Sequence, residues 1–405
     1  MITIGTIVRS LHGKSPREVV QHAAGRLADW AGADALSFPL LPDDIADSAA
    51  THGSARTWQP TDSLRPHVAW VAFPPSSGSG GHTTMFRMMD SARTAGFDNT
   101  LVLYDRYGSD MRAHAATVRA AWPWLDCRIT TLDGDLAEYD VVIASSWPTA
   151  HVVAQRRLRG QPGLYFIQDF EPYFYPRGST YAFAEDSYRL GLRRVALGHM
   201  VAGCLTGELG LSSELVPFGC DAEVYSVLPG TVARRGIVFY AKQGNDRRGY
   251  QLAVQALRAF HRMRPDQPIH VYGDGARDLG IPVIRHGSVR PRELNELYNS
   301  VAAGLALSFT NISLVAEELL RAGVIPVIND SSLARADLDN PHVRWALPTP
   351  ASLARELAAA VDDPPSPESA AEVSLSVRTR GWDYTGALLA TIIREELGAS
   401  RASSS

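Results

Sequence analysis

Short, continuous apolar runs alternate with helical stretches along most of this sequence, and this rhythm constrains the fold more than any other feature. Strands that are buried on both faces of a parallel sheet show such runs, because helices cover both faces. The alternation therefore predicts an α/β protein with doubly wound parallel sheets. The predicted strands lie at residues 67–73, 99–104, 139–145, 163–167, 236–241, 269–272, 283–284, 304–307 and 324–328. The predicted helices lie at residues 16–30, 82–95, 110–121, 250–263, 292–299, 314–321, 352–361 and 383–397.

The rhythm falls into two series, separated by the Pro-Gly pair at 229–230. A chain of 405 residues is too long for one ordinary hydrophobic core and fits two domains. We expect two Rossmann-like domains that face each other across a cleft, with ligands bound at the carboxyl ends of the strands. The predicted division is an N-terminal extension (1–66), a first domain (67–229), a second domain (230–380) and a C-terminal helix (381–405) that packs back on the first domain or frays.

Composition excludes several classes of protein. Lys plus Arg is 39 and Asp plus Glu is 43, a net charge of −4, so the chain lacks the basic excess of a nucleic-acid binder. Three scattered cysteines do not make a disulfide framework or a zinc site. Because no apolar run reaches membrane-spanning length and the first residues do not resemble a secretory signal, we expect a cytoplasmic protein. Association with the inner face of the membrane and the oligomeric state stay open.

Two loops combine backbone access with positive charge. Gly80 and Gly81 lie in a glycine-rich turn after the first strand, followed by His82 and a helix whose first N–H groups are free. Lys242 and Arg248 follow the first strand of the second series, where cations suit phosphate oxygens. The alternatives are a tight strand-to-helix turn for the first loop and a solvated basic loop for the second.

A third segment begins the helix predicted at 314–321. Ser313 is a plausible N-cap, so the amides of residues 311–314 are expected to face an anion. Glu318 lies about one turn into the helix, where it can accept hydrogen bonds from ribose hydroxyls. Glu317 is rotated by about 100° from it, so we expect one of the two to lie on a solvated face.

A fourth segment, residues 165–176, combines aromatic rings with two carboxylates, Asp169 and Glu171, at the end of a predicted strand. Aromatic and polar groups together suit a sugar or another amphipathic ligand. The alternative is a packed aromatic loop that contains an Asp-stabilised turn.

Taken in order, motifs of the second series resemble GT-B glycosyltransferases of family 4. The resemblance covers residues 236–329 well and the first domain more loosely. The motifs are Phe-Tyr-Ala-Lys (239–242), Arg-Gly (248–249), Val-Tyr-Gly-Asp-Gly (271–275), His-Gly-Ser-Val (286–289), Leu-Asn-Glu-Leu-Tyr (294–298), and Glu318 followed by Ala-Gly-Val-Ile-Pro-Val-Ile (322–328). The segments 166–172 and 239–242 resemble the WsaF-like rhamnosyltransferases more narrowly.

The resemblance implies roles at matching positions. Lys242 and Arg248 correspond to residues that neutralise the donor diphosphate, and Glu318 corresponds to a ribose ligand. Further positions implied to contact the donor are Gly80 and Gly81, Ser288 and Val289 near the nucleobase, and Thr310, Asn311, Ile312, Ser313 and Leu314 near phosphate and sugar. The family usually has Glu-x7-Glu, but the position eight before Glu318 is Thr310, which offers a neutral hydroxyl instead. This departure fits a different donor sugar, such as a 6-deoxyhexose, and it also fits loss of activity.

The implied function is transfer of a hexosyl group, in particular rhamnosyl from dTDP-rhamnose, to a glycan or lipid-linked oligosaccharide. The resemblance implies retention of configuration without a bound metal or other cofactor, and cations that stabilise the leaving diphosphate. If the enzyme inverts, Asp169 or Glu171 is the first candidate for the general base. His82 either orients the donor or serves only the fold. The alternatives are a non-catalytic nucleotide-sugar binder and a nucleotide-sugar epimerase.

Overall fold

The computed structural model describes residues 38–50, 53–61, 63–230, 233–243, 246–273 and 278–404. The helix predicted at 16–30, most of the predicted N-terminal extension, and part of the Val-Tyr-Gly-Asp-Gly motif (Asp274 and Gly275) lie outside the described residues, as do Gly244 and Asn245 between Lys242 and Arg248. The chain divides into two compact units, residues 1–45 and 46–405. The first unit contributes a short 3-10 helix, η1 (Pro42–Asp44), to the described part. The remainder of the fold belongs to the second unit.

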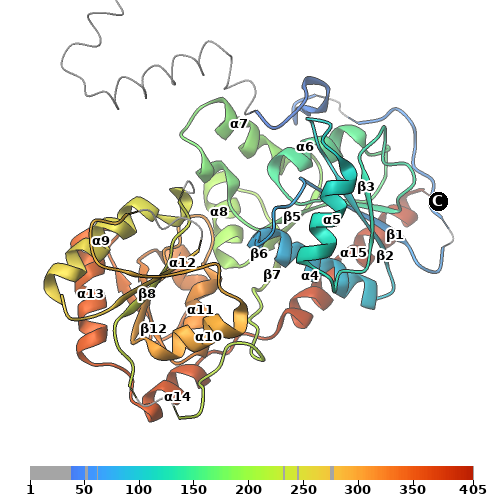
Figure 1. Cartoon of the computed structure of the whole chain (residues 1–405). Coiled ribbons are helices and arrows are strands. Elements are labelled where there is room, and N and C mark those ends of the chain that lie inside the picture. Colours follow the sequence, from blue (N-terminus) through green and yellow to red (C-terminus); the bar gives the residue numbers. More distant parts are fainter. Residues whose placement is uncertain are drawn as a thin grey trace, which may run out of the picture. The chain divides into compact units, whose positions relative to one another are not determined.

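The first sheet of the described chain has seven strands, all parallel, in the order β3-β2-β1-β4-β5-β6-β7 (Figure 1). Its strands are β1 (His67–Ala72), β2 (Asp98–Leu103), β3 (Arg128–Thr131), β4 (Val141–Ala144), β5 (Gly163–Ile167), β6 (Arg193–Leu197) and β7 (Glu214–Val216). The strand order reverses direction between β1 and β4, which is where open α/β sheets form ligand crevices. The predicted doubly wound architecture is confirmed for this half.

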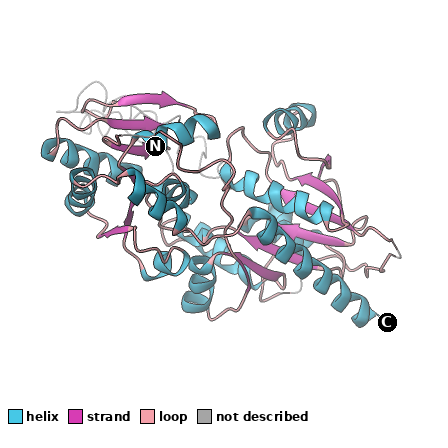
Figure 2. Cartoon of the chain, turned by 90° about the horizontal axis from the view of Figure 1, so that it is seen from below, coloured by secondary structure: helices cyan, strands magenta, loops and turns pink. Residues whose placement is uncertain are grey.

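Helices follow most strands of this sheet and cover both of its faces (Figure 2). They are α4 (Gly80–Thr94), α5 (Met111–Ala121), α6 (Trp147–Arg156), α7 (Ser179–Asp186) and α8 (His199–Leu209), with 3-10 turns η2 (Glu171–Phe174) and η3 (Ser187–Arg189). Local signals explain several of their ends. Asp110 caps α5 by accepting from the amide of Arg112, and Gly210 ends α8 in the left-handed conformation, with φ of 65°.

The second sheet of the described chain has six parallel strands in the order β10-β9-β8-β11-β12-β13. The strands are β8 (Ile237–Tyr240), β9 (Ile269–Tyr272), β10 (Ile284–Gly287), β11 (Ala303–Leu305), β12 (Ile325–Asn329) and β13 (Arg344–Ala346). The helical segments are η4 (Asp246–Arg248), α9 (Tyr250–Met263), α10 (Pro291–Ser300), α11 (Leu314–Arg321), α12 (Ser332–Asp337), α13 (Pro350–Asp362) and α14 (Pro367–Leu375). This order reverses between β8 and β11, so the second sheet has its own crevice.

Each sheet is packed on both faces by apolar side chains, which accounts for the continuous apolar runs. In β1, Val68 to Ala72 are completely buried. In the second sheet, Leu257 of α9 and Leu357 of α13 pack on one face, whereas Leu297 of α10 and Leu320 of α11 belong to the cluster on the other. Within the described residues, no helix is both long and apolar enough to cross a bilayer.

The last helix, α15 (Trp382–Ser404), packs against α4 of the first sheet. A Cβ atom at Gly386 would lie 2.0 Å from the Ser91 hydroxyl oxygen, so the two helices approach as closely as a glycine permits. Arg394 donates to the carbonyl of Ala95 at 2.9 Å, and Arg193 of β6 pairs with Glu395 at 2.8 Å. The chain therefore passes from the first sheet to the second and then returns to the first.

Candidate functional site

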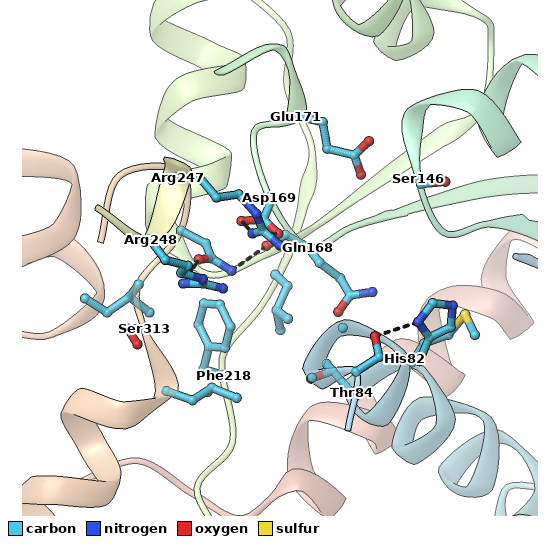
Figure 3. Close-up of a pocket in the computed structure, with 18 of the residues that line it drawn as sticks. His82, Thr84, Ser146, Gln168, Asp169, Glu171, Phe218, Arg247, Arg248 and Ser313 are labelled. Carbon is cyan, nitrogen blue, oxygen red and sulfur yellow. Dashed lines mark hydrogen bonds and ion pairs between the residues drawn. The ribbon is translucent and has the colours of Figure 1, made fainter. Parts of the chain in front are cut away.

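A cavity of about 390 Å³ lies at the carboxyl ends of strands from both sheets. Its walls come from the segments after β1, β4 and β5 on one side, and from those after β8 and β11 on the other (Figure 3). These include the two positions where the strand orders reverse. The cavity is therefore where parallel-sheet topology predicts a ligand site for each half.

The glycine loop after β1 is held in shape by its own side chains. The Nδ1 atom of His82 lies 2.7 Å from the Ser79 hydroxyl, and Nε2 lies 3.1 Å from the carbonyl oxygen of Phe73. Burial lowers the pKa of His82, so the ring is neutral near pH 7 and each nitrogen has a partner inside the loop. Gly80 and Gly81 line the cavity, and a Cβ atom at Gly81 would lie 3.7 Å from Oε1 of Gln168.

The loop after β8 brings positive charge to the opposite wall. Lys242, Arg247 and Arg248 all line the cavity. Arg248 donates to Oδ1 of Asn311 at 3.1 Å, and burial lowers the pKa of its guanidinium, which stays charged. Gly249 then turns the chain into α9 with φ of 63°, and a Cβ atom there would lie 2.6 Å from Leu307. Glycine at 249 thus permits the turn that directs the two arginines into the cavity.

The N-terminus of α11 forms the adjoining part of this wall. Asn311, Ile312, Ser313 and Leu314 line the cavity, as the sequence predicted for a donor-binding segment. A buried hydrogen-bond network positions the segment: the amide of Ser313 donates to the Ser308 hydroxyl at 2.9 Å, and Asn329 both donates to and accepts from the backbone of Ser308 at 2.7 Å. The first amides of a helix lack intrahelical partners and carry partial positive charge, so this end of α11 favours an anion.

A carboxylate from the first sheet faces these cations. Asp169, after β5, accepts from Nη1 of Arg247 at 2.8 Å on both oxygens, and from the Thr310 hydroxyl at 2.8 Å. Arg247 also lies over the ring of Phe174, with its guanidinium carbon 4.6 Å from the ring centroid. Figure 3 shows Arg247 reaching Asp169, with Gln168 extending from the same loop toward His82.

Glu171 lies in the same wall but points away from Asp169, toward the segment that contains Ser146 (Figure 3). Its Oε2 atom accepts from the amide of Trp147 at 2.6 Å, at the N-terminus of α6. Burial raises the pKa of Glu171 to about 8, although the hydrogen bond from Trp147 acts in the opposite direction. Most of this carboxyl is therefore protonated at pH 7.

Glu318 lines a neighbouring cavity of about 270 Å³, which shares Gly80, Thr84 and Leu314 with the first. It accepts from the Tyr298 hydroxyl at 3.3 Å, and that hydroxyl lies 2.7 Å from the hydroxyl of Tyr272. Burial raises the pKa of Glu318 to about 7. The ionised Glu318 carboxylate can accept hydrogen bonds, so this second cavity suits the hydroxyls of a ligand whose charged part lies in the first cavity.

The structure brings together most of the predicted site residues and separates a few. Lining the first cavity are Gly80, Gly81, His82, Asp169, Glu171, Lys242, Arg248, Asn311, Ile312, Ser313 and Leu314. Thr310 is buried behind that wall, and Ser288 and Val289 line neither cavity. The expectation that Glu317 or Glu318 is solvated was wrong. Glu317 is buried and accepts from the Thr379 hydroxyl, while Glu318 is half-buried.

Sequence reasoning did not single out Arg247, Gln168 or Tyr298. Arg247 stands beside Arg248 in the basic loop, and only the turn at Gly249 shows that both face the cavity. Gln168 directly precedes Asp169, so its position after a buried strand was an available signal. Tyr298 belongs to the Leu-Asn-Glu-Leu-Tyr motif (294–298), but that motif gave it no role, because its partners lie on distant segments.

Comparisons with known proteins agree with this geometry. The family description "WsaF, N-terminal domain" matches residues 129–199, and "WsaF, C-terminal domain" matches residues 235–358. The chain therefore contains the N-terminal and C-terminal domains of the WsaF family, in that order. The two matched regions contribute opposite walls of the cavity, with Asp169 and Glu171 in the first and Lys242, Arg248 and the start of α11 in the second.

Solved structures show the same GT-B fold as this chain. HepE of Anabaena, in complex with UDP-glucose, is 14% identical with a TM-score of 0.55, and the match covers 84% of this chain and all of that one. The lipopolysaccharide outer core galactosyltransferase WaaB is 12% identical with a TM-score of 0.55, covering 81% of this chain and 99% of that one. The O-antigen biosynthesis protein RfbC of Myxococcus xanthus is 27% identical over 311 residues, which are 70% of this chain and 23% of RfbC.

Proposed function

We propose that this chain transfers a hexosyl group, with rhamnosyl as the first choice, from a nucleoside-diphosphate sugar to a glycan or lipid-linked acceptor. The observation that carries the proposal is one cavity with two unlike walls. One wall holds Lys242, Arg248 and the amide end of α11, and the other holds the Asp169 carboxylate. Cations and helix amides suit a leaving diphosphate, and a carboxylate suits the positive charge that develops on a sugar during transfer.

In the proposed donor complex, the diphosphate lies between Lys242, Arg248 and the first turn of α11. The ribose then extends into the second cavity, where Glu318 accepts from its hydroxyls. Gly80 lines both cavities and lacks a side chain, which leaves room for the connection between them. The nucleobase extends toward Ser288 and Val289, at the exposed end of β10.

The proposed reaction breaks the bond between the anomeric carbon and the diphosphate oxygen. The acceptor hydroxyl oxygen forms the new glycosidic bond, and its proton passes to the departing diphosphate, with retention of configuration and without a metal ion. The wall of the second domain stabilises the negative charge that appears on the diphosphate. Asp169 faces the sugar, and His82 holds the glycine loop. Should configuration be inverted, Asp169 or Glu171 is the candidate for the general base.

The similar proteins support the donor and acceptor classes. HepE was solved with UDP-glucose, and RfbC is named for O-antigen biosynthesis, so we propose a nucleotide-sugar donor and a polysaccharide acceptor. The RfbC match spans less than a quarter of that protein, and the acceptor class is proposed from its name.

The direct test measures release of nucleoside diphosphate with dTDP-rhamnose, UDP-glucose and other donors, each with and without candidate glycan acceptors. We expect acceptor-dependent release that persists in EDTA, and NMR of the product should show a retained anomeric configuration. Binding without turnover would favour a non-catalytic binder, and acceptor-independent interconversion of donor sugars would favour an epimerase. Absence of both turnover and nucleotide binding would refute the proposal.

A further inference from the structure

The carboxylate that faces the proposed donor sugar is oriented by a residue of the other domain. Thr310, in the loop before α11, donates its hydroxyl to Oδ1 of Asp169 at 2.8 Å. The Thr310 side chain is almost completely buried, with 1% of its surface exposed, and it does not line the cavity. Asp169 does line the cavity. The hydroxyl therefore acts on the carboxylate from behind the wall.

Backbone and amide hydrogen bonds fasten the two loops together on either side of this contact. The amide of Phe170 donates to the Thr310 carbonyl at 3.1 Å, and Nδ2 of Asn311 donates to the Gln168 carbonyl at 3.2 Å. These bonds set the distance between the loops without using the Thr310 hydroxyl. The hydroxyl can thus be removed while the junction keeps its other bonds.

Arg247 holds the same carboxylate from the second domain. Its Nη1 atom is 2.8 Å from both oxygens of Asp169, and its guanidinium packs over the Phe174 ring. An arginine on a flexible stem can swing, and the cavity that it lines is proposed to hold a diphosphate that also attracts it. Thr310 adds a second restraint on Oδ1 that is buried away from the diphosphate, and branching at Cβ restricts its χ1 rotation.

We propose that Thr310 is a positioning residue for sugar transfer, which holds the Asp169 carboxylate in the orientation that faces the donor sugar. The inference rests on the proposed function, because it concerns the transfer step. It adds a role to a residue that contacts neither the diphosphate nor the ribose in the proposed complex.

Two substitutions of similar size separate the hydroxyl from the bulk of the side chain. Thr310→Val keeps the shape and removes the donor, whereas Thr310→Ser keeps the donor and removes a methyl group. We expect kcat to fall roughly tenfold or more in Thr310→Val, since a hydrogen bond to a charged group is lost. The Thr310→Ser variant should stay within about threefold of the parent. The Kd for the nucleoside diphosphate alone, from calorimetric titration, should change less than about twofold in either variant.

A double variant tests whether the effect passes through Asp169. If it does, Thr310→Val should cost little further activity in an Asp169→Asn background. Equal losses of kcat with and without Asp169 would overturn the inference, as would parental kcat in Thr310→Val. The inference would also be overturned if Thr310→Val both lowered kcat and weakened binding of the nucleoside diphosphate, and if Thr310→Ser did the same. That result would show that the substitution disturbs the structure of the site in general. Failure of the proposed function is seen separately, as lack of turnover in the parent protein.

Discussion

The two walls of the cavity differ in how their polar groups are held. On the wall of the first sheet, His82 and Glu171 each bond to backbone or side-chain groups of that same wall. On the wall of the second sheet, Arg248 bonds to Asn311 of the same wall, Arg247 reaches across to Asp169, and the first amides of α11 have no partner within the helix. The polar side chains of the first wall are thus held within that wall, whereas the second wall offers positive charge to an incoming ligand.

This difference suggests separate roles for the two walls in the proposed reaction. A cationic, open wall can neutralise a diphosphate, and a rigid wall with a held carboxylate can meet a sugar at a defined distance. Asp169 is the exception, because its partners Arg247 and Thr310 come from the opposite wall. The comparison therefore predicts that changes to the cations of the second wall affect donor binding, while changes in the first wall, or at Thr310 which bonds to Asp169, affect the transfer step or the fold.

The largest effect is expected at Arg248. Arg248→Met keeps most of the apolar stem and removes the charge, so the nucleoside diphosphate Kd should rise about 10- to 100-fold, the loss for a hydrogen bond between charged groups. The matched control is Arg262→Met, the same substitution at an exposed position on α9. Calorimetric titration measures both. Unchanged affinity in Arg248→Met would mean that the diphosphate binds elsewhere, and would contradict the role proposed for the second wall.

A smaller effect, with a pH signature, is expected at Glu318. Ribose hydroxyls donate hydrogen bonds, so the ionised carboxylate binds better, and affinity should increase as pH rises from about 6 to 8 through the pKa near 7. Glu318→Gln should weaken binding by roughly tenfold at pH 8 and much less at pH 6. The ligand's own titration is common to both proteins, so the ratio of their Kd values isolates Glu318. A ratio that is constant with pH would argue against contact with the ribose.

A change at Glu171 is expected to affect stability and not donor binding. The folded carboxyl has a pKa of about 8 against 4.5 for the free group, so the folded protein keeps a proton that the unfolded chain has lost between these values. The free energy of unfolding should therefore fall as pH rises through this window, by at most about 1.4 kcal/mol per pH unit. Glu171→Gln should remove this contribution and show a shallower slope in denaturant titrations. Parallel slopes in the two proteins would mean that the carboxyl is not buried as described.

Much of the fold could be predicted from apolar runs, and the strands that were missed share a reason. β3, β6, β7 and β13 are short or begin with charged residues, as in Arg193–Leu197, so they do not form continuous apolar runs. The helices α6, α7, α8, α12 and α14 were not singled out either. Strands near a sheet edge are covered less completely than central ones, so their sequences carry a weaker pattern.

The candidate site, too, could be predicted only in part from the sequence. Gly80, Lys242, Arg248 and the start of α11 follow predicted strands directly, and parallel topology collects the carboxyl ends of strands at one edge. The partnership of Asp169 with Thr310 could not be read in this way. These residues are 141 positions apart and belong to different sheets, so no local pattern connects them.

By itself, the sequence determined the two α/β series, the ends of the central strands and the residue types available there. The reason is that a strand buried on both faces of a sheet requires a continuous run of apolar residues. Only the tertiary structure decided how those residues meet. It placed the cationic loop opposite the carboxylate, turned Glu171 toward α6, buried Glu317, and set Thr310 behind Asp169. Such contacts depend on the packing of distant segments, which the spacing of residues along the chain does not encode.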